Sequence, residues 1–264
     1  MRAVACVMIG WLAGAVLAPA AAVTPFRVGE RLHYRMFWGP VIIGHATLEV
    51  RGIEPVDGHD CYHLVAEART VGIGRMFFKL DSATESWLDV EGLFSRRFQQ
   101  NRQEGRRHKR AVTDFDYARG ETITRNLLSG REKRSPLAQP VQDIISALYY
   151  VRSQPLALHQ PAQFTVNAGD KNWTVTFRPD KRQKFEFRAV GEVDALRIEP
   201  TPTIQFVAEN KGRLWFWVSD DRRKLPLQVK STMTLGTATL MLHHVDHVAP
   251  AKLSRASTAV VAAR

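Results

Sequence analysis

The sequence predicts a mainly β fold: a curved antiparallel sheet closing toward a half-barrel or barrel, with one amphipathic helix packed on it. Apolar and polar residues alternate with period two from residue 29 to about 117, and again from 163 to 247. This alternation is typical of half-buried strands. Between the two blocks the spacing changes once to that of a helix. About a dozen strands do not form a stable flat sheet, because open antiparallel sheets of that size curl, split or close.

The first hairpin is predicted from apolar residues at every second position. One face of the first strand carries Leu32, Tyr34, Met36 and Trp38, and Ala46, Leu48 and Val50 repeat the pattern. The Gly39-Pro40 turn lies between the two runs and joins them. Further alternating runs follow at residues 62–69, 84–90, 93–102 and 109–117. The N-terminal half is therefore predicted to be a β-meander.

One helix is predicted over residues 141–153. One helix face would carry Val141, Ile144, Ile145, Leu148 and Tyr149, which have the spacing i, i+3, i+4, i+7, i+8. Asp143 is favourable near the positive N-terminal end, and Pro155 stops the helix. We expect Ile144, Ile145 and Leu148 to be buried against the sheet.

Strands resume after the helix, at residues 163–167, 172–178, 184–190, 196–199, 213–219, 225–232 and 237–247. No Pro/Gly/Ser-rich linker divides the two strand blocks and no repeat of fixed period is present. Residues 23–248 are therefore predicted to form a single domain. From residue 249 the chain is small and polar, so residues 249–264 are predicted to be a disordered tail.

The first 22 residues predict export. Met1-Arg2 is a short basic start, residues 3–17 are apolar, and Ala20-Ala21-Ala22 is an A-x-A site for signal peptidase. The apolar run is shorter than the roughly 18 to 20 residues that a transmembrane helix needs. We expect a signal peptide over residues 1–22, cleavage near Ala22 and a periplasmic location.

The net charge of +11 and the pI near 10.0 favour an anionic partner. Export removes nucleic acid from consideration and leaves lipid head groups, lipopolysaccharide and acidic glycans. A lipid or an acidic glycan of the envelope is the expected partner, with peripheral contact to the membrane surface. The alternative is a basic surface without a target. The sequence gives no indication of oligomeric state.

Cysteine and histidine do not indicate a redox or metal site. Cys61 is the only cysteine after residue 22, so no internal disulfide can form, and its strand-like neighbours favour a small buried side chain. His59 and His63 could share a strand face with Cys61 and hold a metal ion, but no second cluster with ligand spacing supports that alternative. The group His243, His244, Asp246 and His247 alternates between two faces, as at a solvated strand end. No metal or cofactor is predicted.

Catalytic motifs are absent from the sequence. It contains no G-x-S-x-G elbow, no H-E-x-x-H helix, no S-x-x-K, no P-loop and no G-x-G-x-x-G. Asp81, Glu85 and Asp89 form a carboxylate row, but residues four apart on a strand are separated by about 13 Å, too far for the paired carboxylates of glycosidases. Solvated turn and strand positions explain them better. No catalytic residue is predicted, and an enzyme is not expected.

An aromatic pattern supplies the candidate ligand-binding residues. The run Leu214-Trp215-Phe216-Trp217-Val218 is bulky and apolar on both strand faces, and Phe37-Trp38 is similar. Either the helix covers the second face, which is favoured, or that face lines an apolar cavity. The ligand-binding candidates are Phe37, Trp38, Leu148, Trp215 and Trp217. Basic runs at residues 106–110, 131–134, 181–184 and 222–224 fall at or near predicted turns, where charge serves solvation or forms an anion-binding rim.

Four stretches together resemble the DUF3108 family of exported bacterial proteins. They are FRVGERLHY (26–34), GHATL (44–48), DIISALYY (143–150) and the strand pair LWFWVSDD (214–221) with LPL (225–227). The resemblance extends to about His247. It implies a periplasmic β-rich domain of undetermined function, with no catalytic or cofactor residues to carry over.

Three functional hypotheses follow. The favoured one is a non-catalytic protein that binds an amphiphilic or anionic envelope component, such as a lipid, lipoprotein or glycan, in its curved sheet. A structural or assembly protein of the envelope, with a fully packed core and no ligand, is the alternative. A hydrolase of envelope glycans is the least favoured.

Overall fold

The computed structural model describes residues 24–168, 171–187, 191–201, 212–233 and 236–247. The expected signal peptide and C-terminal tail lie outside these residues. Within them, one antiparallel sheet contains all fourteen strands in the order β8-β7-β6-β5-β4-β3-β2-β1-β14-β13-β12-β11-β10-β9. The strands are β1 (Glu30–Trp38), β2 (Val41–Val56), β3 (His59–Thr70), β4 (Leu80–Asp89), β5 (Ser95–Glu104), β6 (Arg107–Asp116), β7 (Glu121–Asn126), β8 (Glu132–Pro136), β9 (Ala162–Ala168), β10 (Lys171–Phe187), β11 (Gly191–Thr201), β12 (Arg213–Ser219), β13 (Pro226–Met233) and β14 (Gly236–His247).

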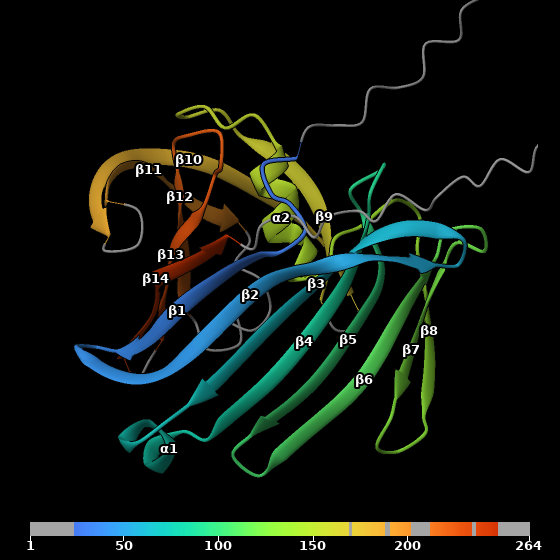
Figure 1. Ribbon diagram of the computed structural model, residues 1–264. Coiled ribbons are helices and arrows are strands. Elements are labelled where there is room, and N and C mark those ends of the chain that lie inside the picture. Colours follow the sequence, from blue (N-terminus) through green and yellow to red (C-terminus); the bar gives the residue numbers. More distant parts are fainter. Residues whose placement is uncertain (1–23, 169–170, 188–190, 202–211, 234–235, 248–264) are drawn as a thin grey trace, which may run out of the picture.

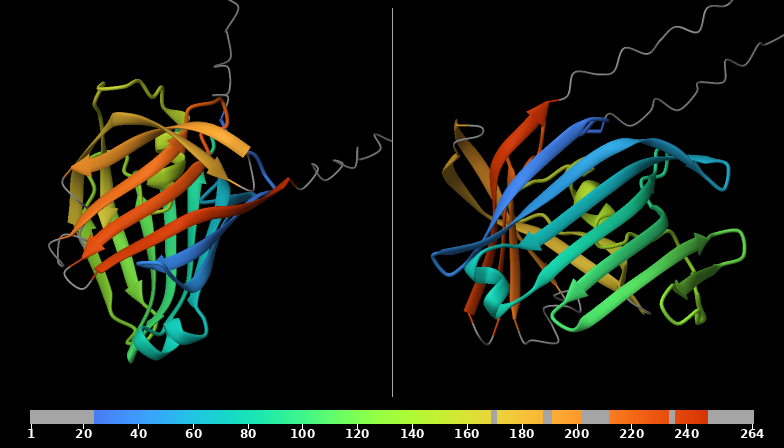
Figure 2. Two further views of the ribbon diagram at one scale, coloured as in Figure 1. Left: turned by 90° about the vertical axis from the view of Figure 1, so that its left-hand side faces the viewer. Right: turned by 60° about the horizontal axis from the view of Figure 1, so that its bottom comes forward.

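The sheet curls into an open barrel-like shell, and the predicted fold class is confirmed (Figure 1). Its two halves face each other, and helix α2 (Ser146–Ser153) lies between them (Figure 2). The edge strands β8 and β9 do not pair with each other. Residues 141–142 fill part of the gap: the Ser95 amide donates to the Val141 carbonyl at 2.9 Å, and the Gln142 amide donates to the Thr165 carbonyl at 2.8 Å. The connection before α2 thus links β5 to β9.

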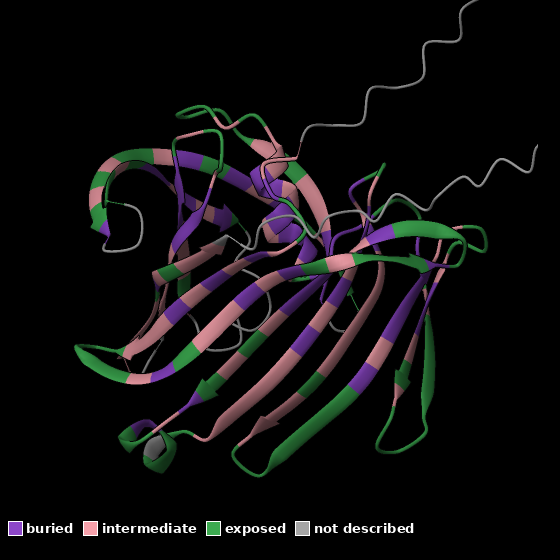
Figure 3. Cartoon of the chain, in the orientation of Figure 1, coloured by how far each residue is buried: buried purple, intermediate pink, exposed green. Residues whose placement is uncertain are grey.

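The predicted first hairpin is present, and its apolar face forms one wall of the core. Leu32 lies opposite Leu48, and Val50 lies opposite Leu64. All four side chains are buried, and each contributes about 1.5 to 3 kcal/mol relative to exposure. Figure 3 shows buried residues alternating with intermediate or exposed ones along these strands. Register is fixed in this hairpin because a slip by one residue would expose this whole apolar row.

The strands and their connections differ from the prediction in three ways. Strands β7 and β8 were not predicted, because Glu121–Asn126 and Glu132–Pro136 contain too few apolar residues to show alternation. The two strands predicted at 172–178 and 184–190 are one strand, β10, which continues through a bulge between Pro179 and Lys181. A short helix, α1 (Ile73–Phe77), connects β3 to β4. Neither α1 nor α2 is long and apolar enough to cross a membrane, and the described residues hold no other helix.

Helix α2 begins five residues later than predicted. Val141 and Gln142 are held in extended geometry by their bonds to β5 and β9, so they cannot join a helix. Asp143 instead accepts hydrogen bonds through Oδ1 from the amides of Ile145 and Ser146, at 2.7 and 2.9 Å. This satisfies donors that a helix start leaves free. The expected burial of Ile144 is wrong: its side chain is 47% exposed.

Two separate apolar clusters meet the two sides of α2. Tyr149 belongs to the main core cluster, against which Ile145 and Leu148 also pack. Val151 belongs to a second cluster with Phe177, Ile198 and Val218. Strand β12 also contributes to both clusters, since Trp217 lies in the main core and Val218 in the second cluster. The expectation that the two faces of this strand need two apolar environments is confirmed, and the helix contributes to both.

Candidate functional site

A cavity of about 590 Å³ lies on the core-facing side of strands β5 to β8. Cross-strand pairing identifies the side, because Leu48, Ala66, Thr84, Gln100, Ala111 and Asn126 form one continuous row across β2 to β7. Leu48 at one end of the row is in the core, and Gln100, Ala111 and Asn126 at the other end line the cavity. The face that is apolar in β1 to β3 thus becomes polar and open in β5 to β7.

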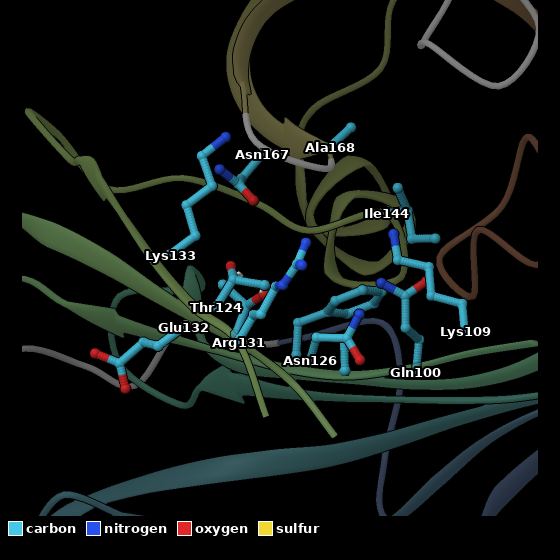
Figure 4. A pocket seen from close by; sticks show the side chains of 13 residues that line it. Gln100, Lys109, Thr124, Asn126, Arg131, Glu132, Lys133, Ile144, Asn167 and Ala168 are labelled. Atoms are coloured by element: carbon cyan, nitrogen blue, oxygen red, sulfur yellow. Dashed lines mark hydrogen bonds between the residues drawn. The ribbon is translucent and has the colours of Figure 1, made fainter. Parts of the chain in front are cut away.

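A second row forms the floor of the same cavity. Phe98, Thr113, Thr124 and Lys133 lie opposite one another on β5 to β8. Thr113 and Thr124 share a hydrogen bond between their hydroxyls at 2.9 Å. The opposite wall comes from the other half of the sheet, through Asn167 and Ala168 of β9, and from Ile144 (Figure 4). The cavity therefore lies at the gap between the two edge strands.

The charged groups of this cavity are mainly cationic. Lys109, Arg131 and Lys133 line it together with one carboxylate, Glu132. Glu132 is already engaged by Arg134 at 2.9 Å and by Arg125 at 3.4 Å, and its carboxylate points away from the other lining groups in Figure 4. Neither Lys109 nor Arg131 forms a salt bridge with a residue that the structure describes. Two of the three cations are thus available for an anion.

The lining chemistry suits binding of an anion that has an apolar part. Ammonium and guanidinium groups bind carboxylate or phosphate oxygens, and guanidinium does so in a bidentate manner. Amides and hydroxyls from Gln100, Thr124 and Asn126 add neutral hydrogen-bonding partners. Phe98 and Ile144 supply the apolar surface. We call this cavity, lined by residues of β5 to β9 and Ile144, the basic cavity.

A second cavity, of about 630 Å³, spans β2 to β6. It is lined by His45, Thr47, Glu67, Arg69, Asp81, Asn101 and His108, among others. Asp81 is bound by both terminal nitrogens of Arg75, at 3.0 and 3.1 Å, and His108 contacts the Asn101 amide oxygen at 2.9 Å. Its charges are mixed and partly paired, so it shows no preference for one class of ligand.

None of the five residues predicted to bind a ligand lines either cavity. Trp217 is buried in the main core, where its indole nitrogen donates to Gln183 Oε1 at 2.7 Å. Trp215 and Leu148 pack against that core, and Phe37 is half-buried on β1. Trp38 is exposed at the end of β1, beside Gly236. These residues therefore do not form one shared surface at either cavity.

The two histidine clusters are held by carboxylates. His63 contacts Glu54 and Glu85 through its two ring nitrogens, at 2.9 and 2.7 Å, and stacks on Trp87 at 4.6 Å. The indole of Trp87 donates to Glu54, which is the main reason that the pKa of Glu54 lies below its usual value. Among the described residues, no group of three or more His, Cys, Asp or Glu side chains is arranged to hold a metal ion.

The second histidine cluster includes a residue that the sequence did not connect with it. His33 on β1 and His244 on β14 lie opposite each other, and both contact Asp246, each at 2.7 Å. The side chain of His247 lies outside the described residues. His244 is exposed, as expected for a solvated strand end.

Cys61 is fully buried, as predicted, and burial raises the pKa of its thiol to about 11.

The three carboxylates that the sequence places in one row have three different partners: Asp81 pairs with Arg75, Glu85 with His63, and Asp89 with Arg96 at 2.8 Å. Asp89 is buried instead of solvated, which corrects the expectation for that residue. Sequence reasoning noticed the basic runs that contain Lys109, Arg131 and Lys133, but it could not assign them to one cavity.

The family model of DUF3108, described as a protein of unknown function, matches residues 33–243. No curated protein sequence matches the chain. A solved structure of a beta-barrel-like protein of the domain of unknown function DUF1849, from Brucella abortus, is similar in fold. The TM-score is 0.53 at 13% identity, over 84% of this chain and 98% of that one. A putative exported protein with a YmcC-like fold from Bacteroides fragilis matches with a TM-score of 0.31 at 8% identity, over 86% of this chain and 100% of that one.

Proposed function

The chain belongs to the DUF3108 family, whose function is unknown, and we propose that it is a non-catalytic periplasmic protein that binds an anionic component of the cell envelope. The observation that carries the proposal is the basic cavity, which Lys109, Arg131 and Lys133 line together with a single carboxylate, Glu132, that is already paired with Arg134. Anionic oxygens, from phosphate or carboxylate, are the chemistry that such a lining recognises.

The size and apolar contacts of the cavity support an amphiphilic ligand. Its volume of about 590 Å³ falls within the range of about 300 to 1,000 Å³ typical of small-molecule sites. Phe98 and Ile144 lie beside the cations, so a ligand with a charged group and a short apolar segment would contact both. The half-exposed position of Ile144, which is unfavourable in water, is consistent with this contact.

Calorimetric titration with matched variants tests the proposal. The ligands are a short-chain phosphatidylglycerol, lipid A and an acidic glycan, each at low and high salt. Lys109→Ala with Arg131→Ala should weaken binding about tenfold or more, because two charge-assisted contacts are lost. The control Lys181→Ala with Arg178→Ala removes the same charge from exposed positions on β10 and should leave binding unchanged. Equal loss in both variants would show that overall charge, and not the cavity, attracts the ligand.

The three ligands distinguish the sources of the anionic group. Binding of the glycan alone would assign a carboxylate ligand, and binding of the lipids alone would assign a phosphate-bearing amphiphile. The absence of a binding signal with all three ligands would favour the alternative of a structural envelope protein without a ligand.

Export is tested separately, by N-terminal sequencing of protein recovered from the periplasmic fraction, where a start near Val23 is expected.

A further inference from the structure

One end of the sheet concentrates the exposed apolar side chains of the described chain. Neighbouring strands are antiparallel, so the connections that follow β1, β3, β5 and β7 all lie at the same end. Eight of the thirteen exposed large hydrophobic residues lie in or beside these connections: Trp38, Val41, Ile42, Ile73, Met76, Phe78, Leu127 and Leu128. Exposed apolar residues that are merely tolerated are normally scattered, so this concentration indicates a binding surface.

Helix α1 forms the most exposed part of this surface. Met76 is 83% exposed and Ile73 is 53% exposed. The helix is fixed in place by β2, since the Val71 amide donates to the Ile43 carbonyl at 2.8 Å. A Cβ at position 74 would collide with the backbone of Ile43, so Gly74 allows this close contact. Val41 and Ile42 belong to the same end of β2, so the β1–β2 turn and α1 lie at the same end of the sheet (Figure 1).

Basic residues without salt-bridge partners border this apolar surface. The β5–β6 turn is attached beside α1, because the Gly105 amide donates to the Lys79 carbonyl at 2.8 Å. Arg106 lies in this turn, and the rest of the basic run, residues 107–110, begins β6. Arg106, Arg107 and Arg110 form no salt bridge within the described part of the chain. The acidic groups nearby, Asp81 and Glu104, are engaged by Arg75 and Arg102.

We propose that this end of the sheet, the apolar rim formed by Trp38, Val41, Ile42, Ile73, Met76 and Phe78, docks on the surface of an anionic phospholipid bilayer. The apolar side chains enter the boundary between head groups and acyl chains, and Arg106, Arg107 and Arg110 contact the anionic head groups. The basic border selects this occupant, because it complements a negative surface and would repel the same rim of a second copy. The proposal goes beyond the basic cavity and does not depend on a ligand there.

Co-sedimentation with vesicles tests the rim. The full protein as recovered from cells is mixed with phosphatidylglycerol–phosphatidylcholine vesicles or with pure phosphatidylcholine vesicles. Binding is expected only to the anionic vesicles and should weaken at high salt. Ile73→Asp with Met76→Asp should lower the partition coefficient about tenfold or more, and Ile73→Ser with Met76→Ser should lower it in the same direction without a change in charge.

A matched control places the same two charges away from the rim. Ile53 and Leu158 are exposed residues near the opposite end of the sheet. Ile53→Asp with Leu158→Asp should leave binding close to that of the unmodified protein. All variants change exposed side chains, so unchanged circular dichroism and melting temperature should accompany each result.

Three outcomes would overturn the proposal. One is the absence of binding to anionic vesicles by the unmodified protein. Another is equal binding by the rim and control variants. The third is a dimer, seen in sedimentation velocity without lipid, that the rim variants convert to a monomer, which would assign the rim to self-association.

Discussion

Arg152 and Glu30 form a buried ion pair that joins helix α2 to strand β1. Arg152 Nη1 lies 2.6 Å from Glu30 Oε1, and Nη2 lies 3.0 Å from Oε2. Arg152 is completely buried and Glu30 is 7% exposed. Arg152 Nη2 also donates to the Arg223 carbonyl at 3.1 Å, so the guanidinium connects the helix, the first strand and the β12–β13 turn. The rings of Phe26 and Tyr149 lie 5.5 and 5.3 Å from its central carbon.

Breaking this pair from one side should be costly. Glu30→Gln leaves the Arg152 cation buried without a counter-charge, so we expect a loss of about 3 to 5 kcal/mol in the free energy of unfolding. Urea denaturation at pH 7 measures it. Glu192→Gln is the control: Glu192 pairs with Lys184 at 2.6 Å, but both side chains are exposed, so little change is expected. A similar small change in both variants would contradict the role assigned to Glu30.

Two buried tyrosines should respond oppositely to loss of the hydroxyl group. Tyr149 is fully buried, and its hydroxyl has no hydrogen-bond partner among the described residues. The Tyr34 hydroxyl donates to the Pro226 carbonyl at 2.8 Å. Tyr149→Phe should therefore leave stability unchanged or raise it by up to about 1 kcal/mol, whereas Tyr34→Phe should lower it by about 1 kcal/mol. Thermal and urea unfolding of the two variants in parallel give the comparison. Destabilisation by Tyr149→Phe as large as that by Tyr34→Phe would reveal an unrecognised partner, such as a buried water.

Asp143 should be essential for the start of α2. Its Oδ1 accepts two helix amides, and its Oδ2 accepts the hydroxyl of Ser86 at 2.6 Å and that of Ser95. Asp143→Ala removes all these acceptors from a buried site, so we expect a loss of at least about 2 kcal/mol and faster amide exchange at Ile145 and Ser146.

Asp143→Asn provides the matched control. Burial raises the pKa of Asp143, against the opposing effect of hydrogen bonds from Ser86 and Ser95, so the negative charge itself adds little stability. Asn keeps an acceptor for the helix amides, and the serine hydroxyls can rotate to accept its NH₂ group. The Asn variant should lie much closer to the unmodified protein than the Ala variant. The reverse order would show that charge, and not hydrogen bonding, governs the site.

The ion pair between Asp180 and Arg197 should make stability depend on pH in the acidic range. Arg197 donates to both Asp180 oxygens, at 2.9 and 2.6 Å, and holds the pKa of that carboxyl below its usual value. A lowered folded-state pKa means that the stabilisation is fully present above about pH 4 and disappears as the pH falls through the folded-state value. Because both side chains are partly exposed, the contribution should not exceed about 1 kcal/mol.

Asp180→Asn isolates this contribution. The variant should be less stable than the unmodified protein at pH 7, and the difference should shrink as the pH falls below about 4. Urea denaturation across pH 3 to 7 gives both curves. A difference that stays constant over this range would mean that Asp180 stabilises the β10 bulge through hydrogen bonding alone.

The local pattern of the chain was sufficient for most strands. Period-two alternation located β1 to β6 and β9 to β14, and β12 was predicted with the boundaries that it has. It failed for β7 and β8, because these two short strands contain too few apolar residues to show alternation. Helical spacing located α2, but residues 141–142 were included because spacing cannot show that their backbone groups are bonded to β5 and β9.

Unlike the strands, the basic cavity and the apolar rim could not be located from the local pattern of the chain. The sequence shows the basic runs that contain Lys109, Arg131 and Lys133. It also shows that the strand containing Trp215 and Trp217 is apolar on both faces. The curvature of the sheet brings Ile144 and β9 opposite β6 to β8, and packing within the main core buries Trp217. The mainly β fold and the presence of an amphipathic helix could be predicted from the sequence, because both follow from side-chain periodicity along neighbouring residues. Which cations face one another, and which apolar residues stay exposed, was decided by contacts between residues distant in the chain, and a single sequence carries no local signal for such contacts.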